Sequence, residues 1–425
     1  MNAPLRMLIL ADDLTGAADC AVACAGHGLR TVVALDDFRG GDADVLAIDA
    51  DTRAADPGEA AVAMARLVRE HGHDDAVLIY KKIDSTLRGN VAVEIAAALK
   101  ARRAICGEGK RVTVVLAPAF PASGRTTLHG RQMLRGVPLE ATDAWRYERA
   151  KPPANIAELF NETGLKAVLM PLEQVRADDL RETMRAMARQ ADVLVCDAET
   201  DEDLRAIADA SMVLGWETIW AGSAGLAYQL PKAAGLARPP VAAPEPALGG
   251  RPMLFVVGSG SDVSRRQAQV LESWPDVVSV RVAPGVLRAG DRMPEWRSHQ
   301  AALERAFSAG VDVLLMMGAD GGTDRGQDPA LAAALGEMVR PFADVVGAGV
   351  ATGGATARAV LRGWGIPGLQ ILGEVEAGVP YSMAAGWRRP LPVLTKAGGF
   401  GKPEALVHCR QFLRGVRGPA RGGTE

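Results

Sequence analysis

The chain has 425 residues, 48% of them hydrophobic, which suffices for two or three domains with their own buried cores. Its 48 Lys and Arg residues nearly match 51 Asp and Glu residues, which argues against a nucleic-acid partner but leaves room for a local cationic pocket. The five scattered cysteines form no C-x-x-C pair, so we expect free thiols. The N-terminal segment lacks a signal-peptide pattern, and no apolar stretch reaches membrane-helix length. We therefore expect a cytoplasmic protein with no membrane partner.

Short apolar segments rich in β-branched residues alternate with Ala-rich amphipathic segments in the first half of the chain. The predicted strands are residues 7–11, 31–35, 45–49, 76–80, 112–117, 167–170 and 193–197, and the predicted helices include residues 58–70 and 90–101. Nearly all-apolar strands separated by helices are typical of an open, mainly parallel α/β sheet that is covered on both faces.

Residues 232–252 are rich in Pro, Ala and Gly and carry no hydrophobic period, which is typical of a linker. After this segment the alternation restarts, with predicted strands at 253–257, 311–317, 345–350, 369–372 and 393–395. We therefore predict an N-terminal α/β domain over 1–231, a C-terminal α/β domain over 253–414 and a disordered tail over 415–425. Because ligands favour domain interfaces and the carboxyl ends of parallel strands, we expect the active site in the cleft between the domains.

Two adjacent carboxylates, Asp12 and Asp13, follow the first predicted strand. They are candidates for ordering substrate hydroxyls or accepting a proton, although Asp13 or Thr15 could equally cap the helix that follows. Arg53 follows the third predicted strand, where it could clamp a carboxylate bidentately or lie at the surface beside Asp51. Neither aspartate pattern has the D-x-D-x-T spacing of haloacid-dehalogenase phosphatases, so that class is disfavoured.

The segment KKIDSTLRGN follows the fourth predicted strand and combines cations, an acid and hydroxyls just before a helix. Lys82, Ser85 and Arg88, with the amides at the helix start, can form an anion site in which Asp84 orders the cations or a sugar hydroxyl. The alternative is a solvated charged turn. The loop over residues 118–127 could reach the same pocket or be an ordinary connector.

Three glycine-rich turns follow predicted strands of the second half: GSGS around Ser259, TGGAT over residues 352–356 and KAGGFG around Gly399. Glycines at such turns let backbone amides approach a phosphate or a flat base closely. The first turn has Val263 at the sixth place of G-x-G-x-x-G, and the chain contains no Walker motif, so neither a dinucleotide fingerprint nor a P-loop is predicted.

Other catalytic signatures are weak in this sequence. His71 and His73 share an H-x-H spacing, but no third ligand is evident, so we predict no metal site built by the protein. The sequence also lacks G-x-S-x-G, which disfavours a serine hydrolase.

Together these segments resemble the four-carbon acid sugar kinase family. The matching segments occur in order along nearly the whole chain: LILADDLTGAAD, DADTR, YKKIDSTLRGN, LAPAFPASGRTT, GSAGLA, VVGSGS, ATGGATA, GEVEAGVP and KAGGFG. The resemblance implies an N-terminal sugar-acid domain, a C-terminal ATP domain and phosphorylation of the terminal hydroxyl of threonate, erythronate or a 3-oxo-tetronate. GEVEAGVP is more similar to the threonate branch, whereas GSGS departs from the more usual GSCS.

The resemblance also implies the residues of the two sites. Substrate contacts map onto Asp12, Arg53, Lys82, Ile83, Asp84 and Ser85, and ATP contacts map onto Ser259, Gly353, Gly354, Ala355, Thr356 and Gly399. The resulting hypothesis is direct phosphoryl transfer, in which Arg53 and Lys82 hold the substrate carboxylate and Asp12 and Asp84 order its hydroxyls. Asp12 or Asp13 accepts the proton, and Mg²⁺ bridges the phosphates of ATP.

Two other classes of function remain as alternatives. A nicotinamide-dependent hydroxy-acid dehydrogenase would oxidise the same substrates, but the expected dinucleotide fingerprint is missing. A non-catalytic sugar-acid sensor would not need a second set of glycine turns. A homodimer is a further expectation about the assembly.

Overall fold

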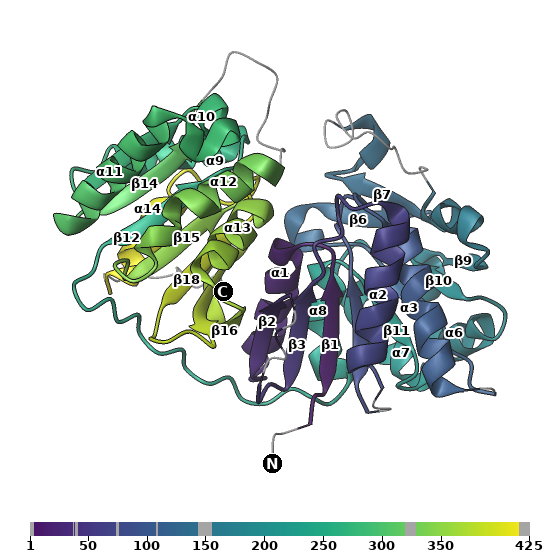
Figure 1. Ribbon diagram of the computed structural model, residues 1–425. Helices are drawn as coiled ribbons and strands as arrows, with labels where there is room; N and C mark the ends of the chain where they lie inside the picture. The colour runs from purple at the N-terminus through teal and green to yellow at the C-terminus, as the bar shows by residue number, and fades with distance from the viewer. Residues whose placement is uncertain are drawn as a thin grey trace. The chain divides into compact units, whose positions relative to one another are not determined.

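The computed structural model describes residues 4–36, 38, 41–73, 76–107, 109–142, 155–318 and 329–415. The chain divides into two compact units, Met1–Val241 and Ala242–Glu425 (Figure 1). All of the predicted tail except Gly415 lies outside the described residues. Within the described residues, none of the helices has the length and apolar character needed to cross a membrane.

The first unit is built on one parallel sheet with the strand order β2-β3-β1-β4-β11-β5-β10-β9. Its strands are β1 (Met7–Ala11), β2 (Thr31–Leu35), β3 (Val45–Asp49), β4 (Leu78–Lys82), β5 (Val114–Ala117), β9 (Ala167–Met170), β10 (Val193–Cys196) and β11 (Ile219–Gly222). Most of these strands are buried along their whole length, as expected for a parallel sheet covered on both faces.

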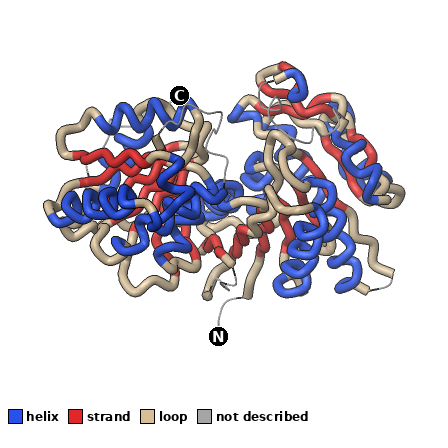
Figure 2. Tube along the Cα trace, turned by 45° about the horizontal axis from the view of Figure 1, so that its top comes forward, coloured by secondary structure: helices blue, strands red, loops and turns tan. Residues whose placement is uncertain are grey.

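Helices cover both faces of this sheet (Figure 2). They are α1 (Leu14–Gly26), α2 (Pro57–His71), α3 (Val91–Cys106), α5 (Leu172–Val175), α6 (Leu180–Ala188), α7 (Asp201–Ser211) and α8 (Ala224–Ala233). Helices α2 and α3 pack together on one face, and α1, α7 and α8 pack together on the other (Figure 1). The predicted mainly parallel α/β class is therefore confirmed for this unit.

The second unit has the strand order β13-β14-β12-β15-β18-β17-β16, which is parallel up to β18 and antiparallel beyond it. Its strands are β12 (Met253–Val257), β13 (Val277–Val282), β14 (Asp312–Met317), β15 (Ala348–Thr352), β16 (Gly368–Glu376), β17 (Val379–Ala385) and β18 (Pro392–Lys396). Its helices are α9 (Asp262–Glu272), α10 (Pro284–Ala289), α11 (Pro294–Ser308), α12 (Pro329–Val339), α13 (Gly354–Trp364) and α14 (Ala405–Leu413).

The structure corrects several predicted boundaries. β4 begins at Leu78 and ends at Lys82, two residues later than predicted, because Lys81 and Lys82 pair with β1 instead of entering a loop. The predicted loop after β5 contains a small antiparallel sheet of β6 (Arg125–Leu128), β7 (Arg131–Leu134) and β8 (Val137–Pro138). The strands β11, β13 and β17 were not predicted, and hydrophobic pattern alone did not identify them.

Candidate functional site

In the first unit, three strands end side by side and bring the predicted substrate residues together. β1 lies between β3 and β4, and its last residue, Ala11, pairs with Asp49 on one side and Lys82 on the other. The backbone N–H groups of Thr52 and Arg53 donate to the Asp12 carbonyl at 3.0 and 3.1 Å. The turn after β3 is thereby fixed against the turn after β1.

Arg53 binds the two adjacent aspartates of its own chain. Its Nε and Nη2 donate to the two carboxylate oxygens of Asp12 at 2.7 and 2.9 Å. Its Nη1 and Nη2 donate to the oxygens of Asp13 at 2.6 and 2.9 Å. The alternative of a surface arginine beside Asp51 is wrong, because the guanidinium forms a bidentate clamp on internal carboxylates.

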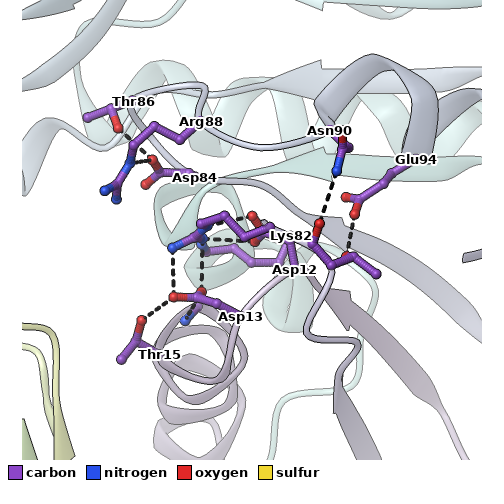
Figure 3. Close-up of polar contacts among 12 residues, drawn as sticks. Asp12, Asp13, Thr15, Lys82, Asp84, Thr86, Arg88, Asn90 and Glu94 are labelled. Atoms are coloured by element: carbon purple, nitrogen blue, oxygen red, sulfur yellow. Dashed lines mark hydrogen bonds and ion pairs between the residues drawn. The ribbon is translucent and has the colours of Figure 1, made fainter. Parts of the chain in front are cut away.

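Asp13 also caps helix α1, as the alternative interpretation of the sequence expected. One carboxylate oxygen accepts from the Gly16 N–H at 2.9 Å, and the other accepts from the Thr15 hydroxyl at 2.6 Å (Figure 3). Asp13 therefore contributes both a helix cap and a negative charge at the end of β1.

Lys82 reaches the same place from the end of β4. A Cβ atom added at Gly16 would lie 2.7 Å from Lys82 Nζ, so the missing side chain of Gly16 makes room for this ammonium group at the start of α1. Burial lowers the pKa of Lys82, but the neighbouring Cys20 and the negative charges of Asp12 and Asp13 outweigh it and raise the pKa above the ordinary value. Lys82 is therefore a cation at neutral pH.

Asp12 is ionised for a related reason. Its side chain is almost fully buried, and burial raises the pKa of a carboxyl group. The positive charges of Arg53, Lys81 and Lys82 act in the opposite direction and hold the pKa of Asp12 below its ordinary value. Asp12 and the cations around it form a compact polar cluster (Figure 3).

Asp84 and Arg88 form a second ion pair in the segment after β4. Arg88 Nε and the Thr86 hydroxyl both donate to Asp84 Oδ2 (Figure 3). Burial raises the pKa of Asp84, yet the charges of Arg88 and Arg53 lower it below the ordinary value. Arg88 is thus paired with Asp84 and its side chain is 39% exposed, while its part in an anion site stays a prediction.

The other two residues of this predicted stretch are placed differently. Ser85 is buried, and its carbonyl accepts a 2.8 Å hydrogen bond from Gln132 Nε2 of strand β7. The Ile83 side chain lies in the hydrophobic core, and its N–H donates to the Gly222 carbonyl at 2.8 Å. The structure therefore does not bring the Ile83 side chain to the polar cluster.

The sequence interpretation missed a buried ion pair behind the cluster. Lys81 Nζ lies 2.8 Å from Glu94 Oε2, and both side chains are at most 1% exposed. The Thr52 hydroxyl donates to the other oxygen of Glu94, while Asn90 Nδ2 donates to the Thr52 carbonyl at 3.0 Å (Figure 3). Asn90 and Glu94 are four residues apart, so the helical spacing could have indicated that they share a face.

We expect Glu94→Gln to lower the free energy of unfolding by about 3 kcal/mol, because the substitution removes the carboxylate that is paired with the buried ammonium of Lys81. Urea denaturation at neutral pH measures this. The matched control is Glu70→Gln, since the Glu70–Arg66 pair is 45% and 49% exposed and such pairs contribute little. Equal effects of the two substitutions would contradict the assigned importance of the buried pair.

In the second unit, the three glycine-rich turns also come from neighbouring strands. β15 lies between β12 and β18, with Thr352 paired to Val257 on one side and Lys396 on the other. The Gly353 N–H donates to the Lys396 carbonyl at 2.7 Å, which ties the second turn to the third. The turns predicted to bind ATP are thus adjacent.

Ser259 lies between the other two turns. A Cβ atom added at Gly353 would be 3.6 Å from Ser259 Cβ, and one added at Gly398 would overlap with Ser259 Oγ. Gly353 has a φ of 96°, a conformation that other residues rarely adopt. Close approach of the turns therefore explains why glycines occupy these positions.

Helix α13 begins directly at the second turn. Gly353 is its N-cap and has no side chain, so within the described part of the chain no side-chain cap is bound to the first-turn amides of this helix. Such a helix start is suited to bind an anionic group. Gly354 and Ala355 are partly or fully exposed there, whereas the Thr356 side chain is buried against Gly258.

The third turn is open on one side at Gly399. A Cβ atom added at Gly399 would meet no atom within 4 Å. The described residues contain no group of three or more His, Cys, Asp or Glu side chains that could hold a metal ion. The arrangement is thus one of amides, hydroxyls and glycine surfaces, which suits a nucleotide.

Both halves of the chain match family models. Residues 7–230 match a sugar-binding N-terminal domain, and residues 254–406 match a nucleotide-binding C-terminal domain. A solved structure of a protein from Haemophilus influenzae has the same fold, with a TM-score of 0.72 and 20% identity, covering 96% of this chain and 100% of its own.

Curated relatives match over nearly their whole length. A D-threonate kinase of Cupriavidus necator is 41% identical, covering 98% of this chain and 100% of the relative. A D-threonate kinase of Bordetella bronchiseptica is 33% identical, covering 96% of this chain and 97% of the relative. A D-erythronate kinase of Heliobacterium modesticaldum is 29% identical, also covering 96% and 97%.

Proposed function

This chain belongs to the four-carbon acid sugar kinase family, and from this we propose that it phosphorylates the terminal hydroxyl of D-threonate with ATP, giving 4-phospho-D-threonate. The observation that carries the proposal is 41% identity over the full length of a D-threonate kinase. Identity to a D-erythronate kinase is lower, at 29%, so D-erythronate and 3-oxo-tetronates are the alternative substrates. The cations Arg53 and Lys82 within the polar cluster of the first unit suit the carboxylate of a sugar acid.

In the proposed mechanism, the first unit binds the sugar acid at the cluster of Asp12, Arg53 and Lys82. Lys82 and Arg53 attract its carboxylate, while Asp12 and Asp84 accept hydrogen bonds from its hydroxyls. Asp12 or Asp13 takes the proton as the hydroxyl oxygen attacks. Because the phosphoryl group carries most of the charge in a loose transition state, positioning and charge neutralisation dominate over proton removal.

The second unit is proposed to bind ATP at the glycine turns around Ser259, Gly353 and Gly399. The amides at the start of α13 face phosphate, and the open side of the third turn receives another part of the nucleotide. Mg²⁺ would enter together with ATP and would supply neutralisation of the phosphate charge, so the protein itself would need to contribute few ligands to it. Direct transfer requires the γ-phosphoryl group of ATP to reach the substrate hydroxyl.

A cytoplasmic location is part of the proposal. Cys20, Cys24, Cys196 and Cys409 are buried free thiols, as is usual in a reducing compartment where ATP is available. A homodimer stays a prediction, which light scattering coupled to size-exclusion chromatography tests.

An ADP-release screen over four-carbon acids tests the proposed function. The substrates are D-threonate, L-threonate, D-erythronate and a 3-oxo-tetronate, with an acceptor-free reaction as the control for ATP hydrolysis. We expect D-threonate to give a kcat/KM at least about tenfold above the others, since one misplaced hydroxyl leaves a buried polar group unpaired. Phosphorus NMR of the product assigns the phosphorylated oxygen.

Other outcomes of the screen select the alternatives. Faster turnover of D-erythronate or the oxo acid would replace the proposed substrate within the same family. ADP release that does not depend on any acid, or no ADP release together with sugar-acid binding, would overturn the kinase proposal and favour a sensor. Reduction of NAD by the same acids would favour the dehydrogenase.

We expect Gly399→Ala to raise the KM for ATP by about tenfold without lowering the unfolding temperature, since the added methyl meets only open space in the protein and would meet the nucleotide. Steady-state kinetics and thermal unfolding measure the two quantities. Gly398→Ala is the contrasting variant, because its methyl would overlap with Ser259 and lower stability. An unchanged KM for ATP in Gly399→Ala would remove Gly399 from the nucleotide site.

A further inference from the structure

The third glycine turn is held in shape by side chains that bind its carbonyl groups. Ser261 Oγ and Ser264 Oγ donate to the Gly398 carbonyl at 2.6 and 2.7 Å. Gln267 Nε2 donates to the carbonyls of Phe400 and Lys402, both at 2.9 Å. Two residues at the start of α9 and one further along it thereby fix most of the turn.

Lys396, at the end of β18, binds one further carbonyl of the turn and one that Gln267 also binds. Its Nζ donates to Ala397 O and Phe400 O, each at 2.8 Å. In a planar trans peptide, the C=O and the following N–H point in opposite directions. The N–H groups of Gly398, Gly399 and Gly401 are therefore directed away from these donors, as in the backbone concavities that bind anions.

We propose that Lys396 is a positioning residue of the nucleotide site, whose ammonium group holds the Gly398–Gly399 turn in the conformation that binds nucleotide. The inference rests on the proposed function, because it takes these turns as the ATP site. It adds a residue that touches no substrate and acts through the turn.

The charge of Lys396 would be unfavourable if its role were only structural. The side chain is 1% exposed, and no carboxylate among the described residues forms an ion pair with it. A buried ammonium without a paired carboxylate lowers stability, and an apolar side chain would fill the same space without that penalty. A retained charge beside an anion-binding turn is instead expected of a functional position.

The groups around Lys396 define how it titrates. Glu376 of β16 accepts from His408 Nδ1 at 2.9 Å, and Cys409 lies on the same helix as His408. The strands on either side of β18, β15 and β17, contain no charged residue. The α9 side chains that bind the turn, Ser264 and Gln267, are neutral, and Lys402 is exposed to solvent. Burial lowers the pKa of Lys396 to about 8, against the opposing potential of Cys409 and Glu376.

This titration has opposite consequences for stability and for binding. Because the pKa is lower in the folded protein than the ordinary 10.5, the folded state loses its proton first as pH rises above about 8. The contribution of Lys396 to stability therefore improves between those two values. Nucleotide affinity falls over the same range, because a neutral amine holds the turn carbonyls less strongly.

Calorimetric titration with ATP and Mg²⁺ at pH 7 and pH 9.5 tests the proposal on the full chain. We expect the wild-type Kd to rise about tenfold between the two pH values. Lys396→Met should bind about tenfold more weakly at pH 7 and converge with the wild type at pH 9.5, with unchanged or higher stability. Lys396→Arg, which stays charged, should show no alkaline loss.

Several results would overturn the inference. A Lys396→Met variant that binds ATP as tightly as the wild type at pH 7, or an alkaline loss that persists in Lys396→Arg, would each do so. If arginine does not fit the buried position, the test is whether the wild type and Lys396→Met have the same Kd for ATP at pH 9.5, and different Kd values there would overturn the inference. If the wild-type protein binds ATP but phosphorylates no four-carbon acid, the proposed substrate is wrong. The Kd values for ATP at the two pH values still test the role of Lys396 in that case.

Discussion

Replacing Asp12 by asparagine is expected to lower kcat/KM for the sugar acid about a thousandfold while the protein still folds. Asp12 is the buried carboxylate that accepts two hydrogen bonds from Arg53 at 2.7 and 2.9 Å and lies beside Lys82. The amide keeps the shape but loses the charge that orders these cations and receives a hydroxyl proton. Steady-state kinetics give kcat/KM, and circular dichroism checks the fold.

Asp13→Asn is the matched comparison, since asparagine caps helices as well as aspartate does. The variant should retain the cap of α1, so its activity reports on the loss of the Asp13 charge and of one acceptor for Arg53 and Thr15. A large loss in Asp12→Asn with a small loss in Asp13→Asn would assign the proton to Asp12. Near-wild-type turnover of Asp12→Asn would end the catalytic candidacy of that residue.

The effect of Asp12→Asn on the free energy of unfolding should depend on pH. Because the pKa of Asp12 is lower in the folded protein than the ordinary value of 3.8, the ionised carboxylate stabilises the fold above that pH. This contribution disappears as the pH falls through the folded-state pKa. Urea denaturation should therefore show Asp12→Asn less stable than wild type at neutral pH, with the difference shrinking below about pH 4.

Much of the substrate cluster could be predicted because its residues follow strands directly. Asp12, Arg53 and Lys82 each stand at or just after the carboxyl end of a strand, and neighbouring parallel strands end at the same edge of a sheet. The position of each residue at the end of a predicted strand therefore indicated that these side chains lie close together. It could not predict that Arg53 would bind Asp12 and Asp13, since the partner of a guanidinium depends on side-chain directions in three dimensions.

The buried lysine shows why other parts were not predictable. Lys81 lies within β4, where a charge is normally excluded, and only the tertiary contact with Glu94 makes this acceptable. The hydrophobic pattern therefore predicts that the strand ends at Tyr80, two residues before its actual end at Lys82. Strand β17 was missed for a different reason: it pairs antiparallel with β16 and β18 and does not follow the strand-helix alternation.

Arg53→Lys is expected to lower kcat/KM for the sugar acid about a hundredfold. The guanidinium donates four hydrogen bonds to Asp12 and Asp13 in a planar fork, which the compact ammonium of lysine cannot reproduce. The matched control is Arg176→Lys, because Arg176 binds Asp203 bidentately at 2.8 and 2.9 Å outside the cluster. That variant should keep wild-type kinetics.

The division of this loss between kcat and KM distinguishes two roles for Arg53. An arginine has five N–H donors, and the two aspartates already occupy four of them, so little of the guanidinium remains for a substrate carboxylate. If Arg53 mainly orients Asp12, kcat should fall by at least about tenfold. A rise in KM for the sugar acid with unchanged kcat would instead show that Arg53 exchanges an aspartate for the substrate and that Lys82 and Arg53 share its carboxylate.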